Sequence, residues 1–182
     1  RLDTAADITH DSCCVTRISL ATHTGTHVDA EAHVIHGGKR LGDYPLTAFS
    51  GLARVADLRG LSVVDASALD SIESCDWLLL CTGQSEKWGS EEYFGTEPLF
   101  TEAFVKAAAR IARKGIGLDC SGLDREGVAL HCVWFSSGGG LMVENLTDLE
   151  MLLSESQILF AAYPLKLAAG DGAPVRAVAV LG

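Results

Sequence analysis

The most informative segment of the chain is His23-Thr24-Gly25-Thr26-His27-Val28-Asp29-Ala30-Glu31-Ala32-His33, because four of the six histidines lie between positions 23 and 36. Threonine, glycine and valine are poor helix formers, so the first part of the segment is predicted to be extended. Side chains of an extended chain alternate between two faces, which would place His23, Gly25, His27 and Asp29 on one face. Gly25 would then leave the space between the two imidazoles empty.

The shared face would bring two neutral nitrogens and one carboxylate to one point. This is the ligand set of a catalytic zinc, manganese or related divalent site, in which the protein leaves at least one position for water. The alternative is that His23 and His27 are surface histidines and Asp29 a capping residue. Glu144 follows an apolar run, where a buried acid needs a compensating cation, so it is either a further ligand or a carboxylate at a helix start. His131, taken alone, is more typical of a buried core histidine.

Around this segment, the apolar residues indicate more strands than helices. Strands are predicted at residues 15–22, running straight into the histidine-rich segment, and at 52–58, 77–82, 116–119, 141–143, 157–162 and 175–181. A helix is predicted over 102–112, with Thr101 as its N-cap and Gly115 as its stop signal, and 145–153 has a helical pattern. The mixed order predicts an α/β or α+β layered domain.

Composition narrows the class of protein. With 182 residues, 48% apolar and 21% charged, residues 1–182 are expected to form one globular domain. The formal charge of −10 disfavours nucleic acid and membrane surfaces as partners, and no apolar run approaches the ~18 residues of a membrane span. The chain begins at Arg1 without a basic-then-apolar leader, so we expect that an N-terminal segment is incomplete.

Two further features have less specific interpretations. The six cysteines form no C-x-x-C motif and mostly lie beside apolar runs, which indicates a reducing, cytoplasmic compartment. Adjacent Cys13 and Cys14 beside His10 rarely converge on one metal ion. The run Gly138-Gly139-Gly140 could hold an anion, but a flexible lid or turn is the better interpretation because no phosphate-loop lysine follows.

The motif His23-Thr24-Gly25-Thr26-His27-Val28-Asp29 with His33 resembles that of the metal-dependent cyclase family, to which the bacterial arylformamidases (kynurenine formamidases) and the isatin hydrolases belong. The resemblance spans roughly residues 16–182. It also covers residues 80–83, 87–89, 117–124, 144–146, 164–166 and 171–176. The chain departs from the family pattern at Glu31, where a proline is usual, and at Gln84, where an aromatic residue often stands. The resemblance leads us to expect that the N-terminal segment that helps to form the substrate pocket is largely absent.

By this resemblance, the fold is an α/β, swivelling β/β/α domain with a mixed sheet and flanking helices. The resemblance implies that His23, His27 and Asp29 hold a first divalent metal, zinc or manganese. Asp29 and Glu144 would bridge to a second ion, which His131 would also ligate. His33 would transfer protons, and the protein would be a homodimer or homotetramer.

We therefore expect a metal-dependent hydrolase of a small amide, lactam or lactone, with kynurenine formamidase activity as the leading case. In this interpretation the ion activates a water molecule, and His33 exchanges protons with the water and the leaving group. Two alternatives belong to other classes. One is a non-catalytic subunit that binds a metal or a small ligand, and the other is a thiol-based redox protein.

Overall fold

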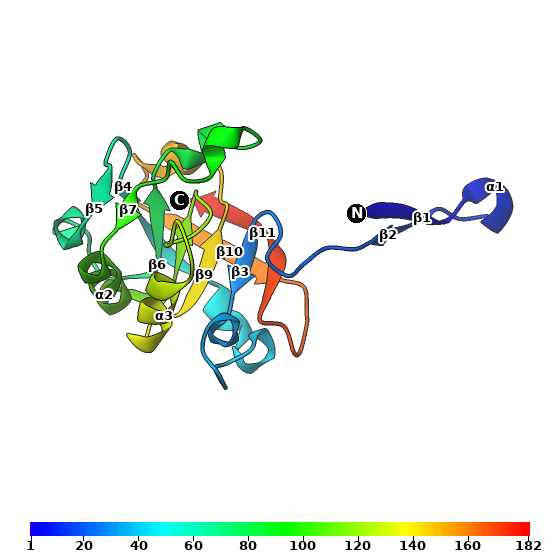
Figure 1. The fold of residues 1–182 in the computed structure, drawn as a ribbon, viewed down its shortest axis with the longest axis horizontal. Helices are drawn as coiled ribbons and strands as arrows, with labels where there is room; N and C mark the ends of the chain where they lie inside the picture. The colour runs from blue at the N-terminus through cyan, green and yellow to red at the C-terminus, as the bar shows by residue number, and fades with distance from the viewer.

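Seven strands close into a barrel in the order β10-β11-β3-β9-β8-β6-β4 (Figure 1). The computed structural model describes all residues from Arg1 to Gly182. The barrel strands are β3 (His27–Asp29), β4 (Ser50–Asp57), β6 (Cys75–Cys81), β8 (Ala112–Leu118), β9 (Leu141–Glu144), β10 (Ile158–Pro164) and β11 (Gly172–Leu181). Neighbours from β4 through β6 and β8 to β9 are parallel, and the other pairs are antiparallel. The predicted mixed α/β architecture is confirmed.

Strand β6 shows why the barrel has two separate apolar cores. Its side chains alternate, so Trp77 and Leu79 join the interior cluster, whereas Leu78 and Leu80 join the cluster beneath the helices. The helices α2 (Glu102–Ile111) and α3 (Ala129–Ser136) pack on that outer side. None of the helices combines the length and the apolar character that a membrane crossing requires.

Several sequence predictions were right in kind but not in detail. Thr101 caps α2 by accepting a hydrogen bond from the Phe104 amide, as predicted. Gly115 does not stop the helix, because α2 ends at Ile111 and Gly115 lies within β8, where an added Cβ would be 2.3 Å from the Leu141 carbonyl oxygen. The helical pattern at 145–153 yields only a short 3₁₀ turn. Helix α3 was not predicted.

The remaining elements are short. Strand β5 (Val63–Val64) pairs with β7 (Leu99–Phe100) outside the barrel. The 3₁₀ turns are η1 (Glu31–His33), η2 (Leu41–Asp43), η3 (Leu46–Phe49), η4 (Ala66–Leu69), η5 (Gln84–Lys87), η6 (Glu91–Tyr93) and η7 (Leu149–Leu152). After α3, Gly139 packs so closely on Trp134 that an added Cβ would lie 2.4 Å from its ring, so the glycine run forms a tight turn.

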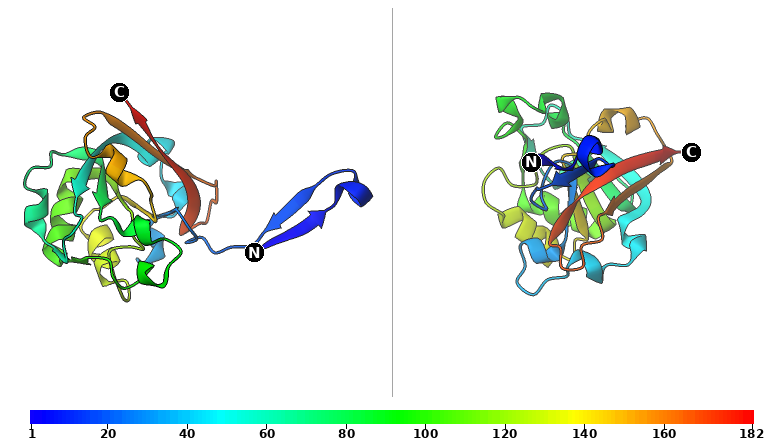
Figure 2. Two further views of the ribbon diagram at one scale, coloured as in Figure 1. Left: turned by 90° about the horizontal axis from the view of Figure 1, so that it is seen from above. Right: turned by 90° about the vertical axis from the view of Figure 1, so that its right-hand side faces the viewer.

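The first eighteen residues form an arm that projects away from the barrel (Figures 1 and 2). Strands β1 (Leu2–Ala6) and β2 (Val15–Ile18) pair antiparallel, with α1 (Ile8–Asp11) between them. The strand predicted over 15–22 is confirmed over 15–18, but it ends there, belongs to the arm and does not run into the histidine-rich segment. Leu2, Ile8 and Ile18 are exposed, and Leu2 is 71% exposed. An isolated two-stranded hairpin is at best marginally stable in water.

Candidate metal centre

Strand β3 places the central residues of the site, because it is hydrogen-bonded to β9 on one edge and to β11 on the other. His27 and Asp29 are two residues apart on a strand and share one face, and their exposed fractions are 3% and 1%. Glu144 is directly opposite His27 in the antiparallel pair with β9, so the two side chains are neighbours. The strand pairing therefore brings together one imidazole and two carboxylates in a buried position.

The sequence-predicted group of His23, His27 and Asp29 is close together in space. Asp29 Oδ1 is 2.7 Å from His23 Nδ1 and 3.2 Å from His27 Nε2. The predicted reason for Gly25 was wrong: residues 23–26 are not in a strand, and an added Cβ at Gly25 would meet nothing within 4 Å. Glycine suits this position because its φ is +64°, in the left-handed region. The turn aims the Gly25 carbonyl at His27 Nδ1, which donates a hydrogen bond to it over 2.8 Å.

A second group is formed by His131, Glu144 and Asp29. His131 Nε2 is 3.0 Å from Glu144 Oε1, and its Nδ1 is 2.7 Å from Asp124 Oδ2. Asp124 also accepts hydrogen bonds from the Leu130 and His131 amides, so it fixes both the start of α3 and the ring of His131. Sequence reasoning gave Asp124 no role, although it lies within the stretch that carries the family resemblance.

Gly122 is required beside this second group. Its φ is +133°, and an added Cβ would be 2.6 Å from Glu144 Oε1 and 3.0 Å from His131 Cε1. Any side chain at this position would therefore separate the acid from the imidazole.

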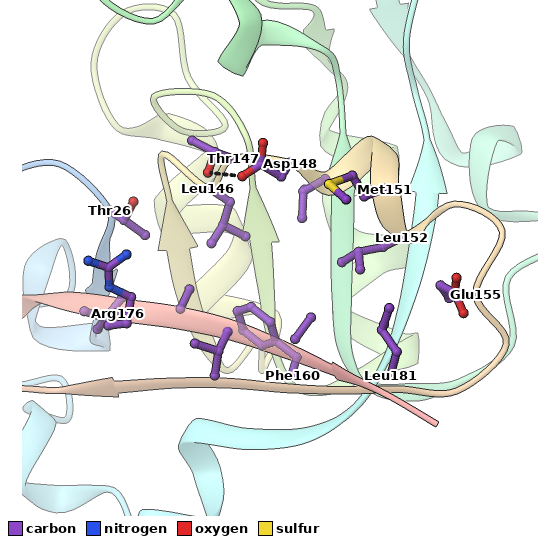
Figure 3. Close-up of a pocket in the computed structure, with 15 residues that line it drawn as sticks. Thr26, Leu146, Thr147, Asp148, Met151, Leu152, Glu155, Phe160, Arg176 and Leu181 are labelled. Carbon is purple, nitrogen blue, oxygen red and sulfur yellow. Dashed lines mark hydrogen bonds between the residues drawn. The ribbon is translucent and has the colours of Figure 1, made fainter.

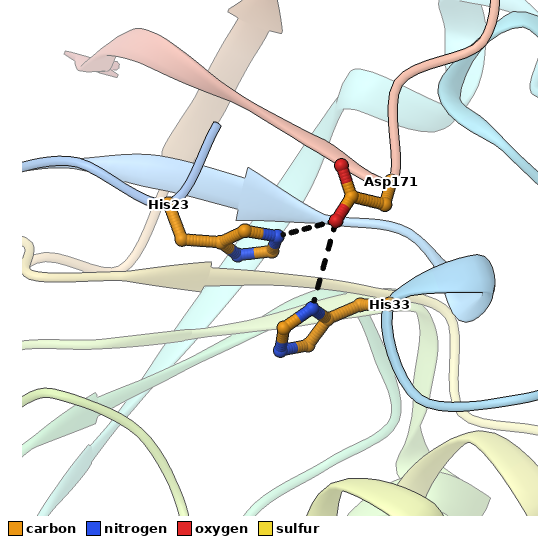
Figure 4. Close-up of side chains that lie close together, drawn as sticks. All are labelled: His23, His33 and Asp171. Atoms are coloured by element: carbon orange, nitrogen blue, oxygen red, sulfur yellow. Dashed lines mark hydrogen bonds and ion pairs between the residues drawn. The ribbon is translucent and has the colours of Figure 1, made fainter. Parts of the chain in front are cut away.

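His33 lies on the open side of the first group, next to Asp171 (Figure 4). The rings of His33 and His23 have centroids 3.9 Å apart. Asp171 Oδ2 is 3.1 Å from His23 Nε2 and 3.9 Å from His33 Nδ1, so one carboxylate faces both histidines. Asp171 precedes β11, and its carbonyl accepts a hydrogen bond from the Ala30 amide. Asp171 was not predicted, because no feature of the sequence marks it apart from its place in a family-like stretch.

The charges of the site are strongly coupled. Burial alone would lower the pKa values of His23 and His131. The carboxylates of Asp29 and Asp171 raise the pKa of His23 to about 9, and those of Asp124 and Glu144 raise the pKa of His131 to about 10. Protonated imidazoles thus balance the buried acids, and a divalent cation could replace those protons.

Three buried atoms of the site, which lack good hydrogen bonds, indicate that its residues could bind a metal ion. His27 Nε2 and both carboxylate oxygens of Asp29 are buried without a well-aligned hydrogen-bond partner. Buried polar atoms are rarely left unsatisfied, and these three are a nitrogen and two oxygens of the kinds that bind zinc or manganese. In each of the two groups the ligand atoms lie within 4.8 Å of one another. The residues therefore fit one or two divalent ions.

A pocket of about 360 Å³ opens onto these groups. His33 and His131 line it, and Trp88 and Phe94 form an aromatic wall with exposed fractions of 57% and 68%. A larger cavity, of about 710 Å³, lies between η7 and β11 and is lined by none of the histidines (Figure 3). The smaller pocket is therefore the one that combines ligating groups with a surface for an organic molecule.

Comparisons with known proteins agree with this geometry. A family model described as "Putative cyclase" matches residues 3–125. A kynurenine formamidase of Bacillus mycoides (strain KBAB4) is 30% identical over 172 residues, covering 90% of this chain and 78% of that protein. The solved structure of a predicted metal-dependent hydrolase from Bacillus stearothermophilus is 27% identical, with a TM-score of 0.75 and coverage of 97% and 84%. Isatin hydrolase A from Labrenzia aggregata shares the fold, with a TM-score of 0.81, 23% identity and coverage of 98% and 82%.

Proposed function

This chain belongs to the cyclase family, and from that premise we propose that it is a metal-dependent hydrolase of small amides, lactams or lactones, with N-formylated aryl amines as the leading substrate class. The similarity to kynurenine formamidases and to a metal-dependent hydrolase supports cleavage of a carbon–nitrogen bond. One observation carries the proposal: His27 Nε2 and the Asp29 carboxylate are buried close together without a well-aligned hydrogen-bond partner, beside a half-buried histidine in an aromatic-walled pocket.

We assign the ligands in two groups. His23, His27 and Asp29 would hold the first ion, and Asp29, His131 and Glu144 would hold a second, with zinc or manganese as the metal. The clustering of the ligand atoms supports both groups. When bound, such an ion supplies a water molecule whose pKa is lowered to ~7 and a Lewis acid that polarises a carbonyl group.

His33 is proposed as the proton-transferring residue. Burial lowers its pKa below the usual ~6.5, so the ring is neutral at pH 7 and free to accept a proton. Its Nδ1 faces Asp171, which leaves Nε2 for the reacting groups. Proton transfer by a positioned side chain typically contributes ~10²–10⁴-fold to the rate. Trp88 and Phe94 are suited to contact the aromatic ring of an aryl amide.

We further propose that the protein is a homodimer or homotetramer and that the arm supplies contacts between subunits. The exposed apolar side chains of the arm, which have no partner within their own chain, support this proposal. Light scattering at micromolar concentration should give a mass well above that of one 19.2 kDa chain. A mass near 19.2 kDa would contradict it.

We also propose that residues 1–182 act as one domain in a reducing, cytoplasmic compartment, which the six free thiols support. A small molecule is the proposed partner, and the net charge of −10 argues against nucleic acid or a membrane surface.

The test is metal analysis of the purified protein by mass spectrometry, followed by a screen of N-formyl anilines, cyclic imides and lactones with added Zn²⁺ or Mn²⁺. We expect a co-purified divalent metal and turnover that a chelator abolishes. The variant His33→Ala should lose turnover, whereas His36→Ala, an exposed histidine outside the pocket, should not. Bound metal with no hydrolysis of any of these compounds would favour a non-catalytic binding role.

A further inference from the structure

Asn145 has an unusual backbone conformation immediately after Glu144. Its φ is +56°, in the left-handed region that few residues other than glycine adopt and that asparagine tolerates. The turned backbone makes two long-range contacts: the Asn145 amide donates to the Cys120 carbonyl over 3.0 Å, and its own carbonyl accepts from Thr26 Oγ1 over 2.6 Å. Asn145 is thereby fixed against the segment that leads into β3.

The side chain of Asn145 meets the same carbonyl as the ring of His27. Asn145 Nδ2 donates to the Gly25 oxygen over 3.1 Å, and His27 Nδ1 reaches that oxygen at 2.8 Å. A carbonyl oxygen only accepts, so Nδ1 must carry a proton, and in the neutral ring Nε2 is the nitrogen with a free lone pair. The position of the Gly25 carbonyl therefore decides which nitrogen of His27 faces Asp29.

Tyr93 contacts the other polar atom of the Asn145 side chain, its Oδ1. Its hydroxyl, in a side chain that is 2% exposed, donates to Asn145 Oδ1 over 2.6 Å, which orients the amide so that Nδ2 faces Gly25. The Tyr93 ring also packs edge-on against Trp88 and Phe94, with centroids 4.9 and 5.0 Å away. One residue thus contacts both the aromatic wall of the pocket and the chain of hydrogen bonds to His27.

We propose that Tyr93 and Asn145 are positioning residues that act through the Gly25 carbonyl to hold His27 in the Nδ1-protonated tautomer, with Nε2 presented to the metal. The role of the metal rests on the proposed function, whereas the tautomer rests only on the contacts described above. Partners of metal-ligating histidines commonly affect metal affinity by about 10–100-fold.

The experiment is a double-mutant cycle with Tyr93→Phe, Asn145→Gly and the double variant. Tyr93→Phe removes one oxygen and leaves the ring stacking intact, and Asn145→Gly suits the left-handed backbone and adds no charge. The matched control is Tyr163→Phe, which removes a hydroxyl that bonds Ser50 outside the pocket. Zinc affinity is measured by competition with a chromophoric chelator. The His27 tautomer is measured by ¹⁵N NMR in the metal-free protein at an alkaline pH at which the ring is neutral, because burial lowers the pKa of His27 but the nearby Asp29 and Glu144 raise it by more.

We expect Asn145→Gly to weaken zinc binding about 10-fold and Tyr93→Phe to weaken it by a smaller factor. The double variant should bind no more weakly than Asn145→Gly, because both residues act along one path. His27 should show the Nδ1-protonated tautomer in the wild type and the Tyr163→Phe control, and a mixture of tautomers in Asn145→Gly.

Zinc affinities within twofold of wild type for both single variants, together with an unchanged tautomer, would overturn the inference, as would fully additive losses. A wild-type protein that binds zinc but hydrolyses nothing in the screen would refute the proposed hydrolase and leave the affinity test intact. If the wild type binds no zinc, the tautomer measurement still decides whether Asn145 positions His27.

Discussion

Replacing His27 with alanine and replacing His33 with alanine should impair the protein in two different ways. His27 is buried, its Nδ1 is held by the Gly25 carbonyl, and its Nε2 lies 3.2 Å from Asp29 Oδ1 and 3.4 Å from Glu144 Oε2. The His33 side chain is 27% exposed and stacks on His23 at the open side of the pocket. The first substitution removes a candidate ligand, and the second removes a candidate proton carrier.

The expected changes in Tm follow from the free energy of metal binding, which adds to the stability of the folded protein. A metal present at 100 times its Kd stabilises the fold by about 2.7 kcal/mol. If loss of the His27 nitrogen weakens binding about 100-fold, the same metal concentration equals the new Kd and stabilises by only about 0.4 kcal/mol. The difference of about 2.3 kcal/mol corresponds to roughly 5–9 °C in Tm for a domain of this size. His33→Ala should keep the full metal-dependent rise in Tm and lose about 10²-fold or more in kcat.

The assay is the Tm of each variant with metal at 100 times the wild-type Kd minus its Tm with chelator, so that any packing loss cancels, together with the metal-to-protein ratio and kcat. If His33→Ala loses its metal as completely as His27→Ala, His33 is a ligand and another group, such as Glu31, must carry the proton. If His33→Ala keeps both metal and activity, the proposed mechanism is refuted.

Three further predictions concern the stability of the fold and the packing beside the site. Burial raises the pKa of Asp76, but the hydrogen bonds and charges of Arg113 and the other donors around it lower this pKa by more, so that the net shift is downward. The ionised carboxylate therefore stabilises the fold above about pH 4. Asp76→Asn should therefore cost about 1 kcal/mol at pH 7 and converge with wild type as the pH falls through the folded pKa, measured by urea unfolding at several pH values. Gly172→Ala should weaken metal binding in the chelator competition, because the new Cβ would lie 2.7 Å from His23 Cε1. Phe104→Ala should lower the free energy of unfolding by about 3–5 kcal/mol in a denaturant titration and leave the metal-to-protein ratio of folded molecules unchanged.

Local signals were sufficient for some elements of the fold and absent for others. Thr101 and the amphipathic residues after it predicted α2 with its start in the right place, and the apolar run from Trp77 predicted β6. Helix α3 escaped prediction because it is apolar on most sides and its N-cap residue is Val128, which has no capping side chain; the acceptor of its first amides, Asp124, lies four residues earlier. Closure of the barrel depends on pairs such as β10 with β4, whose partners are about a hundred positions apart and leave no local pattern.

At the site, sequence reasoning found the residues whose spacing follows the strand period. His27 and Asp29 are two positions apart on β3, and their shared face could be predicted without a structure. Asp171 reaches His23 across 148 positions, and Tyr93 reaches Asn145 across 52. These contacts arise only from tertiary packing. The sequence predicted that Gly25 matters because it has no side chain between the two histidines. In the structure it matters because its φ lies in the left-handed region, which residue spacing does not reveal.

The position of β3 between β9 and β11 has a consequence for biosynthesis. His23, His27 and Asp29 are synthesised well before the strand that fixes Asp29, which begins at Gly172. At roughly 5–20 residues per second, about 7–30 s of translation separate Asp29 from Gly172. During that interval the nascent chain carries three candidate ligands without the fold that brings them together. Metal loading should therefore follow synthesis of β11, and a nascent chain stalled before β11 should fail to retain the ion although it carries every candidate ligand of the first group.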